Sequence, residues 1–215
     1  MEYDVKAIAE IVKKVISGCE AEDNLVPVGV SNRHIHLSQE HLEILFGKGY
    51  ELTKLKDLSQ PGQYACKEQL TLIGPSLKSI EGVRVLGPVR KESQVEISRT
   101  DSFTLKVKPP VRESGKIEGS APVTIVGPKG IVTLKEGCIL ANRHIHMSLE
   151  DGKKFNVKDG EYVAVSAKGD GKRTTLYDVQ VRVSDKFALE MHLDTDDANA
   201  CGIGNGCKVK IVSND

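Results

Sequence analysis

Residues 31–40 read Ser-Asn-Arg-His-Ile-His-Leu-Ser-Gln-Glu, and residues 141–150 read Ala-Asn-Arg-His-Ile-His-Met-Ser-Leu-Glu. The shared Asn-Arg-His-Ile-His core returns 110 positions later, with His144 in the place of His34. This spacing is far too long for a solenoid repeat. It indicates two similar halves, each of which contributes an equivalent strand to a shared site.

The His-x-His spacing in each copy has a direct structural meaning. Because residues i and i+2 of a β-strand point to the same face, His34 and His36 project together, and so do His144 and His146. The isoleucine between each pair then points the other way, into the core. Two adjacent neutral imidazoles make half of a site for zinc or a neighbouring transition metal. A single copy is explained equally well as a hydrogen-bonded strand surface, but two copies use four of the six histidines, so we predict metal binding.

The length and charge of the chain limit its class. At 215 residues it can hold one large domain or two small ones, and the repeat favours two. Lys and Arg together number 30, as do Asp and Glu, so the formal net charge is zero. We therefore expect no broad basic surface for DNA or RNA. An aromatic content of 4 % without Trp also argues against stacked-base recognition of single strands, although basic residues can gather locally around an anionic small molecule.

Membrane and secretion signals are missing from the sequence. No run approaches about eighteen apolar residues, which argues against a transmembrane helix. The N-terminus Met1-Glu-Tyr-Asp-Val lacks the pattern of a secretory signal. The five cysteines form no Cys-x-x-Cys pair, which favours a reduced, cytosolic chain.

Residues 3–17 carry apolar side chains at helical spacing between Glu and Lys residues, which predicts an amphipathic helix that ends at Gly18. Such a helix can pack on its own subunit or on a partner subunit, and we favour this interpretation. The alternative is a detachable docking peptide. Residues 19–25 are polar and are predicted to form a linker.

From residue 26 onward, short apolar runs between turns predict a mainly β protein. A short helix over Gln39–Phe46 is opened by Ser38, and Ser148 has the same capping place after the second repeat. A Gly169-Asp-Gly hairpin turn separates two of the later strands. The predicted strands are Gln69–Ile73, Val83–Leu86, Val95–Ile97, Thr104–Val107, Val123–Val126, Tyr162–Ala167, Thr175–Val183, Ala188–Leu193 and Cys207–Val212.

Many short strands with regular turns indicate either β-barrels or a sandwich. The fold that we expect is two small β-barrel domains with short capping helices and an N-terminal amphipathic helix, and the choice of barrels rests on the family resemblance given below. The predicted division is an N-terminal helix and linker over residues 1–25, a first barrel half over residues 26–115 and a second barrel half over residues 116–215. The Pro-, Gly- and charge-rich residues 109–119 form an exposed connection near the midpoint. Strands can be exchanged between the two halves.

Together with the two repeats, two other segments resemble a known family. Gly87-Pro-Val-Arg-Lys-Glu-Ser-Gln-Val-Glu-Ile-Ser-Arg-Thr-Asp lies between the repeats, and Glu190-Met-His-Leu-Asp-Thr-Asp-Asp-Ala-Asn-Ala follows them. With these motifs the chain resembles the PduL-type phosphate propanoyltransferase (phosphotransacylase) family over residues 26–212. The resemblance implies an enzyme that exchanges an acyl group between coenzyme A and inorganic phosphate. It also implies two β-barrels with the active site between them, two zinc ions per chain and a homodimer.

The resemblance assigns metal ligands by matching motif. It implies a first zinc ion held by two imidazoles and a carboxylate, with the sulfur of coenzyme A in the fourth position. It implies a second zinc ion held by three imidazoles, with water completing the shell. The implied ligands are His34, His36 and Glu96 for the first ion and His144, His146 and His192 for the second.

The resemblance also assigns the substrate site. It implies that Arg90 binds phosphate. The positions that it places along the coenzyme A site are Ser31, Lys56, Arg84, Leu86, His192 and Asn199. Of these, Lys56 competes with Lys54, which lies one same-face step away on the strand.

The chemistry of such a transfer explains why these residue types are needed. The thiol must be a thiolate, the phosphate must be held in line, and charge on the carbonyl oxygen must be stabilised. Coordination to zinc deprotonates a thiol, and three ligands with one open position are typical of catalytic zinc. Arg90 follows the Gly87-Pro-Val turn and can present its guanidinium to phosphate bidentately. Glu96 alone has the pattern of a solvent-facing strand residue, so only the resemblance makes it a ligand.

We predict direct acyl transfer within a ternary complex, without an acyl-enzyme. A cysteine near a histidine is the alternative nucleophile, but Cys138 and Cys201 lie in segments that are typical of structural residues. The second metal, or the imidazoles that hold it, can polarise the acyl carbonyl or orient phosphate. The sequence leaves both roles open.

Two other functions are compatible with the sequence. A zinc-dependent acyl-CoA hydrolase would use the open metal position to generate hydroxide. A non-enzymatic metal-binding or scaffold protein would bind metal but not coenzyme A. We favour a cytosolic enzyme of acetate or propanoate metabolism. The alternative location is a bacterial microcompartment, with the N-terminal helix docking to shell or core proteins.

Overall fold

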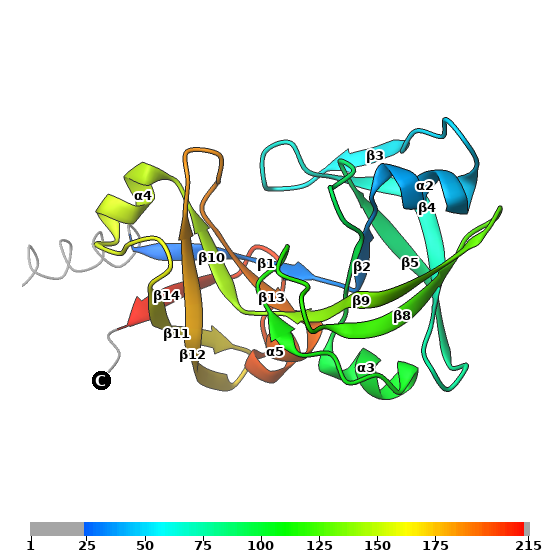
Figure 1. Ribbon diagram of the computed structural model, residues 1–215. Helices are drawn as coiled ribbons and strands as arrows, with labels where there is room; N and C mark the ends of the chain where they lie inside the picture. The colour runs from blue at the N-terminus through cyan, green and yellow to red at the C-terminus, as the bar shows by residue number, and fades with distance from the viewer. Residues whose placement is uncertain (1–23, 213–215) are drawn as a thin grey trace, which may run out of the picture.

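The computed structural model describes residues 24–212 of the chain. The helix predicted over residues 3–17 lies outside this part, as does nearly all of the predicted linker. Figure 1 shows two lobes side by side, each made mainly of β-strands with short helices against them. Each lobe is a closed ring of six strands, which confirms the predicted mainly β fold with two barrels.

One lobe, which we call the His144 barrel, closes because β1 pairs with both β13 and β14. Its ring order is β1 (Leu25–Ser31), β13 (Glu190–Asp194), β10 (His144–Met147), β12 (Lys172–Val183), β11 (Tyr162–Gly169) and β14 (Lys208–Val212). Strand β10 is antiparallel to β13 and parallel to β12. The tight turn between β11 and β12 confirms the predicted Gly169-Asp-Gly hairpin.

The other lobe, the His34 barrel, closes through β8, which pairs with both β4 and β9. Its ring order is β4 (Tyr64–Ile73), β5 (Ser79–Gly87), β2 (His34–His36), β6 (Gln94–Glu96), β9 (Ile131–Ala141) and β8 (Ala121–Val126). Two more strands lie outside the ring: β3 (Lys54–Asp57) pairs with β4, and β7 (Val111–Arg112) pairs with β9.

The chain crosses between the barrels at the two repeats. Strand β1 belongs to the His144 barrel and β2 to the His34 barrel, so the first crossing lies between Ser31 and His34. The second crossing, in the opposite direction, lies between Ala141 and His144, where β9 is followed by β10. Figure 1 shows β1 and β9 leading from one lobe to the other. Each His-x-His strand therefore starts at the junction of the barrels. The predicted division into residues 26–115 and 116–215 stays a prediction.

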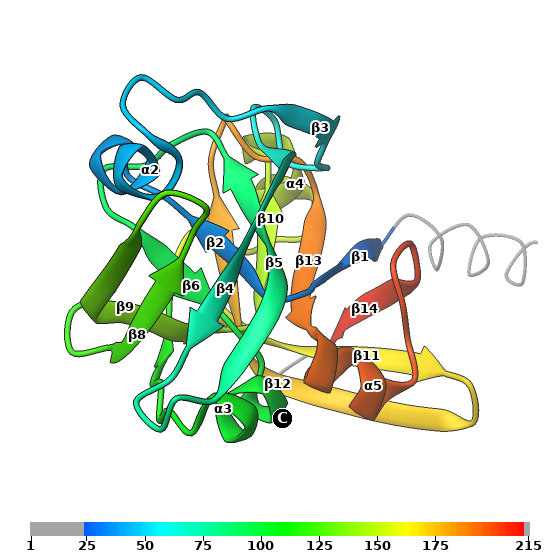
Figure 2. The same cartoon turned by 90° about the vertical axis from the view of Figure 1, so that its right-hand side faces the viewer.

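Short helices pack against the strands of both barrels. In the described part of the chain they are α2 (Gln39–Phe46), α3 (Arg99–Leu105), α4 (Leu149–Lys154) and α5 (Thr195–Cys201). Helix α2 has the predicted bounds, and Ser38 and Ser148 cap α2 and α4 as predicted. Figure 2 shows α5 beside the β11–β12 hairpin, which it contacts.

The predicted strand Thr104–Val107 is wrong, because its first residues belong to α3. A capping box starts this helix: Ser98 Oγ accepts the Asp101 N–H and Asp101 Oδ2 accepts the Ser98 N–H, both at 3.2 Å. The β-branched and apolar residues that suggested a strand lie downstream of that box. Helix α5, which no apolar period marked, likewise starts at a capping carboxylate, that of Asp194.

Each barrel has its own apolar core, and the isoleucine of each repeat is part of it. Ile35 and Ile145 are fully buried, as the alternation predicted. Burying such a side chain contributes about 1.5–3 kcal/mol relative to exposing it. This burial directs the imidazoles on either side of each isoleucine to the opposite face of the strand. None of the helices within residues 24–212 is long and apolar enough to cross a bilayer.

Candidate metal centre

Strand pairing in the His34 barrel brings together the first predicted ligand set. His34 is the register partner of Glu96 in the antiparallel pair β2–β6. His34 Nε2 lies 3.5 Å from Glu96 Oε2, and His36 Nε2 lies 3.8 Å from Glu96 Oε1. One ligand atom from each of the three residues lies within 4.8 Å of the others, and all three residues are buried. Glu96 therefore faces the imidazoles, although its strand pattern alone favoured solvent.

In this first group, the pKa values of Glu96 and His34 shift in opposite directions. Burial raises the pKa of Glu96, but the charge of His34 and a hydrogen bond with it prevail and hold that pKa well below its usual range. Burial lowers the pKa of His34, but Glu96 prevails and leaves it raised. Burial, His34 and Arg90 lower the pKa of His36 well below its usual value, so this ring is neutral. A divalent cation bound by these ligands would take the place of a proton on His34.

The His144 barrel presents three imidazoles. His144 is the register partner of His192 in the pair β10–β13, and their rings stack with centroids 5.1 Å apart. The ring of His146 lies 4.7 Å from that of His144 and 4.9 Å from that of His192. Burial, then the charge of His192, lowers the pKa of His144 to about 4, and burial, then His144, lowers the pKa of His146 to about 2. His144 and His146 are therefore neutral at physiological pH and can donate lone pairs to a metal.

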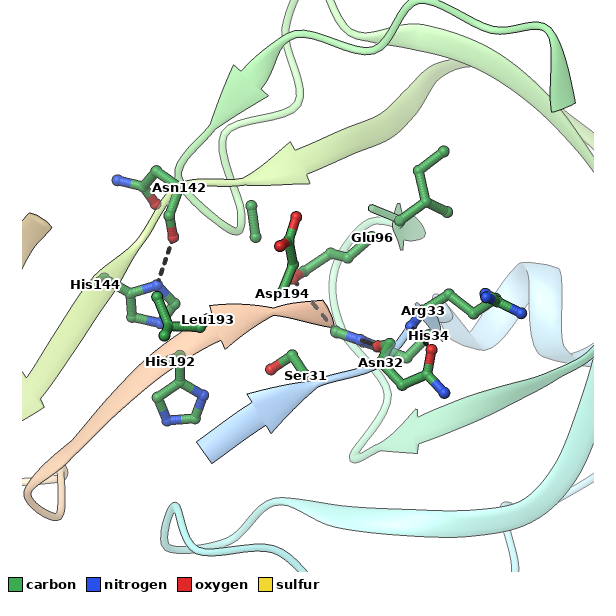
Figure 3. Close-up of a pocket in the computed structure, with 12 residues that line it drawn as sticks. Ser31, Asn32, Arg33, His34, Glu96, Asn142, His144, His192, Leu193 and Asp194 are labelled. Carbon is green, nitrogen blue, oxygen red and sulfur yellow. Dashed lines mark hydrogen bonds and ion pairs between the residues drawn. The ribbon is translucent and has the colours of Figure 1, made fainter. Parts of the chain in front are cut away.

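In each repeat, the backbone carbonyl of the asparagine fixes the ring of the histidine two residues later. The Asn32 carbonyl accepts a hydrogen bond from His34 Nδ1 at 2.8 Å, and the Asn142 carbonyl accepts one from His144 Nδ1 at 2.8 Å. Figure 3 shows the contact of Asn142 with His144, and His192 next to it. Such a bond fixes the tautomer and leaves Nε2 of each ring available to a metal.

The arginine of each repeat ties a crossing to a helix. Arg33 forms a two-point ion pair with Asp101 of α3, with contacts of 2.8 and 3.0 Å. Arg143 Nε donates to Asp197 of α5 at 2.7 Å, and its Nη1 donates to the Tyr177 carbonyl at 3.1 Å. Both carboxylates lie in the first turn of their helices. The two crossings are therefore anchored in equivalent ways.

Both groups fit zinc. Zinc binds His nitrogen and carboxylate oxygen, and catalytic zinc sites have three protein ligands and an open position. Nδ1 of His146 is buried and has no hydrogen-bond partner within residues 24–212. A buried polar atom of this kind costs free energy unless a ligand satisfies it. One donor set with a carboxylate and one set of three imidazoles are therefore suited to two divalent ions.

The two groups line a single cavity of about 240 Å³ between the barrels. All six predicted metal ligands line it, and so does Arg90. Figure 3 shows Ser31, His34, Glu96, His144 and His192 around the same junction. The structure thus brings together ligand groups that the sequence could only place on separate strands.

Arg90 reaches the cavity from the loop after β5. Its backbone N–H donates to the Leu37 carbonyl at 2.8 Å, and its Nη1 donates to Ser114 Oγ at 3.1 Å. Ser114 Oγ donates in turn to Glu96 Oε1 at 2.7 Å, so one hydroxyl links the guanidinium to the first ligand group. Burial lowers the pKa of Arg90, yet a guanidinium stays charged at any physiological pH.

A groove of about 780 Å³ shares His34, Leu86 and His192 with the cavity. Most of the positions predicted along the coenzyme A site line this groove, namely Ser31, Lys56, Arg84, Leu86 and His192. Asn199 instead lies exposed in α5 and outside the groove lining, so its role stays a prediction. Lys54 pairs with Asp57 and does not line the groove, which favours Lys56 as the groove lysine.

The site also contains residues to which the sequence analysis gave no role. Arg182 and Phe187 line the cavity. Glu190 Oε2 lies 2.9 Å from His192 Nε2, and Asn205 Oδ1 accepts the Val30 N–H at 2.7 Å. The predicted strand Thr175–Val183 contained Arg182, but its alternation could not indicate which face meets the cavity. That face depends on the pairing of β12 with β10.

The described cysteines lie away from the cavity. Cys66, Cys138 and Cys201 are buried and Cys207 is exposed, and none of these four lines the cavity or the groove. Burial raises the pKa of Cys66 to about 11 and that of Cys138 to about 12. A thiol must be ionised to act as a nucleophile. Cys66 and Cys138 are therefore poorly suited as nucleophiles, and the structural role expected for Cys138 and Cys201 stays a prediction.

Two closed barrels with an arginine and two metal-ligand groups in the cavity between them define a double-barrel protein with a candidate dinuclear metal site. A model of the phosphate propanoyltransferase family matches residues 27–204. The chain is 58 % identical to a phosphate propanoyltransferase of Lachnoclostridium phytofermentans over 87 % of each protein. It is 53 % identical to one of Thermotoga maritima, over 94 % of this chain and 95 % of that relative. The chain belongs to the phosphate propanoyltransferase family and is an acyltransferase, which confirms the predicted family and enzyme class.

Proposed function

We propose that this phosphate acyltransferase exchanges a short acyl group, propanoyl or acetyl, between coenzyme A and inorganic phosphate by direct transfer. The observation that supports the proposal most is the one cavity onto which both histidine groups, Glu96 and Arg90 open. A cavity that offers metal ligands and a partly buried guanidinium suits a reaction that passes an acyl group from a sulfur ligand to a phosphate. The names of the relatives agree with phosphate and a propanoyl group as substrates.

Two zinc ions per chain are part of the proposal. His34, His36 and Glu96 would hold the first ion, and the three imidazoles of the His144 barrel would hold the second. Zinc supplies a thiolate form of the coenzyme A thiol and positive charge near the acyl carbonyl or the phosphate. The carbonyls of Asn32 and Asn142 support both sets by fixing a histidine in each.

The substrates would be held by basic side chains. Arg90 would bind inorganic phosphate, with its guanidinium oriented by Ser114. Lys56 and Arg84 line the groove and would meet the phosphates of coenzyme A. Arg84 Nη1 donates to the Cys66 carbonyl at 2.6 Å, which orients its side chain in the groove. Ser31, Leu86, His192 and Asn199 complete the proposed coenzyme A contacts.

Direct transfer needs no nucleophile from the enzyme. A phosphate oxygen forms a bond to the acyl carbon while the carbon–sulfur bond breaks, and the electron pair leaves with the sulfur. The burial and raised pKa of Cys138 and Cys66 support this route. Replacing each of the five cysteines by Ala or Ser should therefore leave most activity. Loss of turnover in one such variant with normal zinc content would contradict direct transfer.

The proposal is tested by measuring metal content and phosphate-dependent acyl-CoA turnover on the same preparation. We expect about two zinc ions per chain and acyl-CoA consumption only when phosphate is present. Chelation should abolish turnover, and added zinc should restore it. Thioester loss without phosphate would favour a zinc-dependent acyl-CoA hydrolase. Tight metal binding without coenzyme A affinity in calorimetry would favour a non-enzymatic metal-binding protein.

We further propose a homodimer located in the cytoplasm. The alternative location is a bacterial microcompartment, with residues 1–25 docking to shell or core proteins. Light scattering during gel filtration tests the dimer, and a monomer mass would reject it. Deleting residues 1–20 tests the N-terminal segment: loss of folding supports a structural role, while a soluble and active variant supports docking.

A further inference from the structure

Arg182 lies on the face of β12 that faces the cavity between the barrels. It is the register partner of His146 in the parallel pair β10–β12, and register partners present their side chains to the same face of a sheet. His146 is one of the cavity imidazoles, and Arg182 lines the same cavity as Arg90. The Arg182 side chain is 22 % exposed, so its guanidinium lies mostly out of bulk water.

The ion pair of Arg182 leaves its guanidinium with bonding capacity. Its Nη2 lies 3.5 Å from Glu113 Oε1, which is longer than a good charge-assisted hydrogen bond. Glu113 is also bound by Lys116 Nζ at 2.7 Å and by Gln180 Nε2 at 3.5 Å. A guanidinium has several N–H donors in a planar fork. The contact with Glu113 therefore leaves N–H donors of Arg182 available for a ligand.

An aromatic ring supports the guanidinium from one side. Cζ of Arg182 lies 5.6 Å from the centroid of the Phe187 ring. The Phe187 ring in turn lies 4.2 Å, between centroids, from the ring of His146. A guanidinium stacked in this way loses little further freedom when it binds a ligand. Arg182 is thus held beside the second metal group by packing.

Two guanidinium groups in one small cavity repel each other. Burial lowers the pKa of Arg90 and outweighs the raising effect of Glu96, and the charge of Arg182 lowers this pKa further. Glu96 lies in the same cavity, but it is engaged by His34 and by Ser114. An anion with more than one negative charge would relieve this repulsion and give both guanidinium groups a partner. Phosphate near neutral pH is such an anion.

We propose that Arg182 is a catalytic residue that binds the same inorganic phosphate as Arg90, from the opposite barrel. This assignment rests on the proposed function, because it takes phosphate as the substrate of the cavity. Arg90 comes from the His34 barrel and Arg182 from the His144 barrel. Phosphate would therefore be held across the junction, beside both metal groups.

The test is steady-state kinetics of Arg182→Gln with phosphate and acyl-CoA varied separately. We expect the KM for phosphate to rise about tenfold to a hundredfold, which corresponds to loss of a hydrogen bond to a charged group. The KM for acyl-CoA should change less than about twofold and the zinc content should stay as in the wild type. Arg173→Gln is the matched control, because Arg173 is an exposed arginine of the same strand.

Glu113→Gln separates phosphate binding from a merely structural ion pair. It removes the partner of Arg182 but keeps the guanidinium, so the KM for phosphate should stay the same or fall. If Glu113→Gln reproduces the effect of Arg182→Gln, or if Arg182→Gln leaves the KM for phosphate unchanged, the assignment is overturned. Should Arg182→Gln fail to fold, Arg182→Met takes its place, because it keeps the apolar stem without the charge, and an unchanged KM for phosphate in that folded variant overturns the assignment equally.

Calorimetry with inorganic phosphate distinguishes this inference from the proposed function. In the metal-loaded protein, Arg182→Gln should weaken phosphate binding by the same factor as it raises the KM. A wild-type protein that binds phosphate but shows no phosphate-dependent turnover would contradict the proposed function, while weaker binding by Arg182→Gln would still support the inference. Equal phosphate affinity of the two proteins would overturn it.

Discussion

Each residue of the Asn-Arg-His-Ile-His repeat has its own task in the structure. The asparagine carbonyl holds the first imidazole through Nδ1, as in the pair Asn32 and His34. The arginine pairs with a helix carboxylate, as in Arg33 with Asp101. The isoleucine fills a barrel core. The second histidine completes the pair of imidazoles, so the repeat carries ligand, support and anchor within five consecutive residues.

Glu96→Gln should remove one of the two proposed metal ions. The amide keeps the size of the side chain but lacks the negative charge that stabilises a cation, so we expect zinc to fall from about two to about one per chain. Turnover should fall by at least about 100-fold, because replacing even an outer partner of a metal ligand costs about 10–100-fold. Elemental analysis and kinetics measure both effects.

Glu68→Gln is the matched control for that substitution. Glu68 is a buried carboxylate of the same barrel, bonded to Tyr50 Oη at 3.0 Å and to the Thr53 N–H at 2.9 Å, and it lies outside the cavity. This variant should retain both metal ions. Loss of both ions from Glu96→Gln would show that the two ligand groups do not bind independently.

The same control makes a prediction about pH. Burial raises the pKa of Glu68, but hydrogen bonds from its own backbone, Thr53 and Tyr50 prevail and lower it below 4.5. A carboxyl with a depressed pKa stabilises the fold above its unfolded pKa and loses that contribution as pH falls through the folded pKa. Wild type should exceed Glu68→Gln by about 1–3 kcal/mol near neutral pH, and this gap should shrink below pH 4.5. Urea unfolding at several pH values measures it, and a constant gap would contradict the shift.

At the scale of elements, two helices start with capping boxes, and one of these boxes also contacts a repeat. Asp101 takes part in the α3 capping box and also pairs with Arg33 next to His34. Asp151 forms the corresponding box of α4 with Ser148. The α4 box follows the ligand strand β10, but its carboxylate pairs with neither arginine of the repeats. The cap of α3 therefore contacts a residue next to a candidate metal ligand, whereas the cap of α4 does not, and the two helices can be compared.

Ser98→Ala and Ser148→Ala should each lower the free energy of unfolding by about 1 kcal/mol, since each loses the N-cap acceptor of its helix. Only Ser98→Ala should weaken zinc binding by the first group, by about tenfold, because its helix anchors Arg33. Urea denaturation and a competition assay with a zinc chelator measure the two effects. Equal zinc affinity in the two variants would argue that α3 does not support the metal group.

Local sequence signals explain most of the element predictions and also their failures. The cap at Ser38 and the hairpin turn after Gly169 were predicted because they depend on adjacent residues. The strand predicted over Thr104–Val107 failed because the capping box upstream of it outweighed β propensity. Glu96 was placed among the metal ligands by resemblance alone. Its position opposite His34 depends on the register of β2 and β6, and these two residues lie 62 positions apart in the sequence.

At the scale of the whole molecule, a few contacts join the barrels around the groove. Gln60 Nε2 donates to the Ala188 carbonyl at 3.0 Å, and the Ala188 N–H donates to Gln60 Oε1 at 3.2 Å. We call these two hydrogen bonds the Gln60 clasp, and Gln60 itself is 3 % exposed. Beyond this clasp, the Thr100 N–H donates to Asp196 Oδ2 at 2.7 Å. The Gln60 clasp holds the loop between β3 and β4, which lines the groove, against the segment before β13.

Gln60→Ala should loosen the groove. We expect about 1–3 kcal/mol of lost stability, because the Ala188 backbone groups lose their partners. We also expect a KM for acyl-CoA about tenfold higher, with zinc content unchanged. Gln39→Ala is the control, since Gln39 is exposed on α2 and its side chain donates to Glu43 across one helical turn. An unchanged KM for acyl-CoA in Gln60→Ala would show that the clasp does not shape the groove.

The sequence by itself determined the local features of this protein: paired imidazoles on two strands, core isoleucines between them, helix caps and a mainly β chain. These follow from the two-residue period of a strand and from hydrogen bonds between near neighbours. Only the tertiary structure decided that the chain crosses between barrels at both repeats, that both ligand groups line one cavity, and that Arg182 lies there with Arg90. The physical reason is that barrel closure and register join residues far apart in the chain, and no local period carries that information.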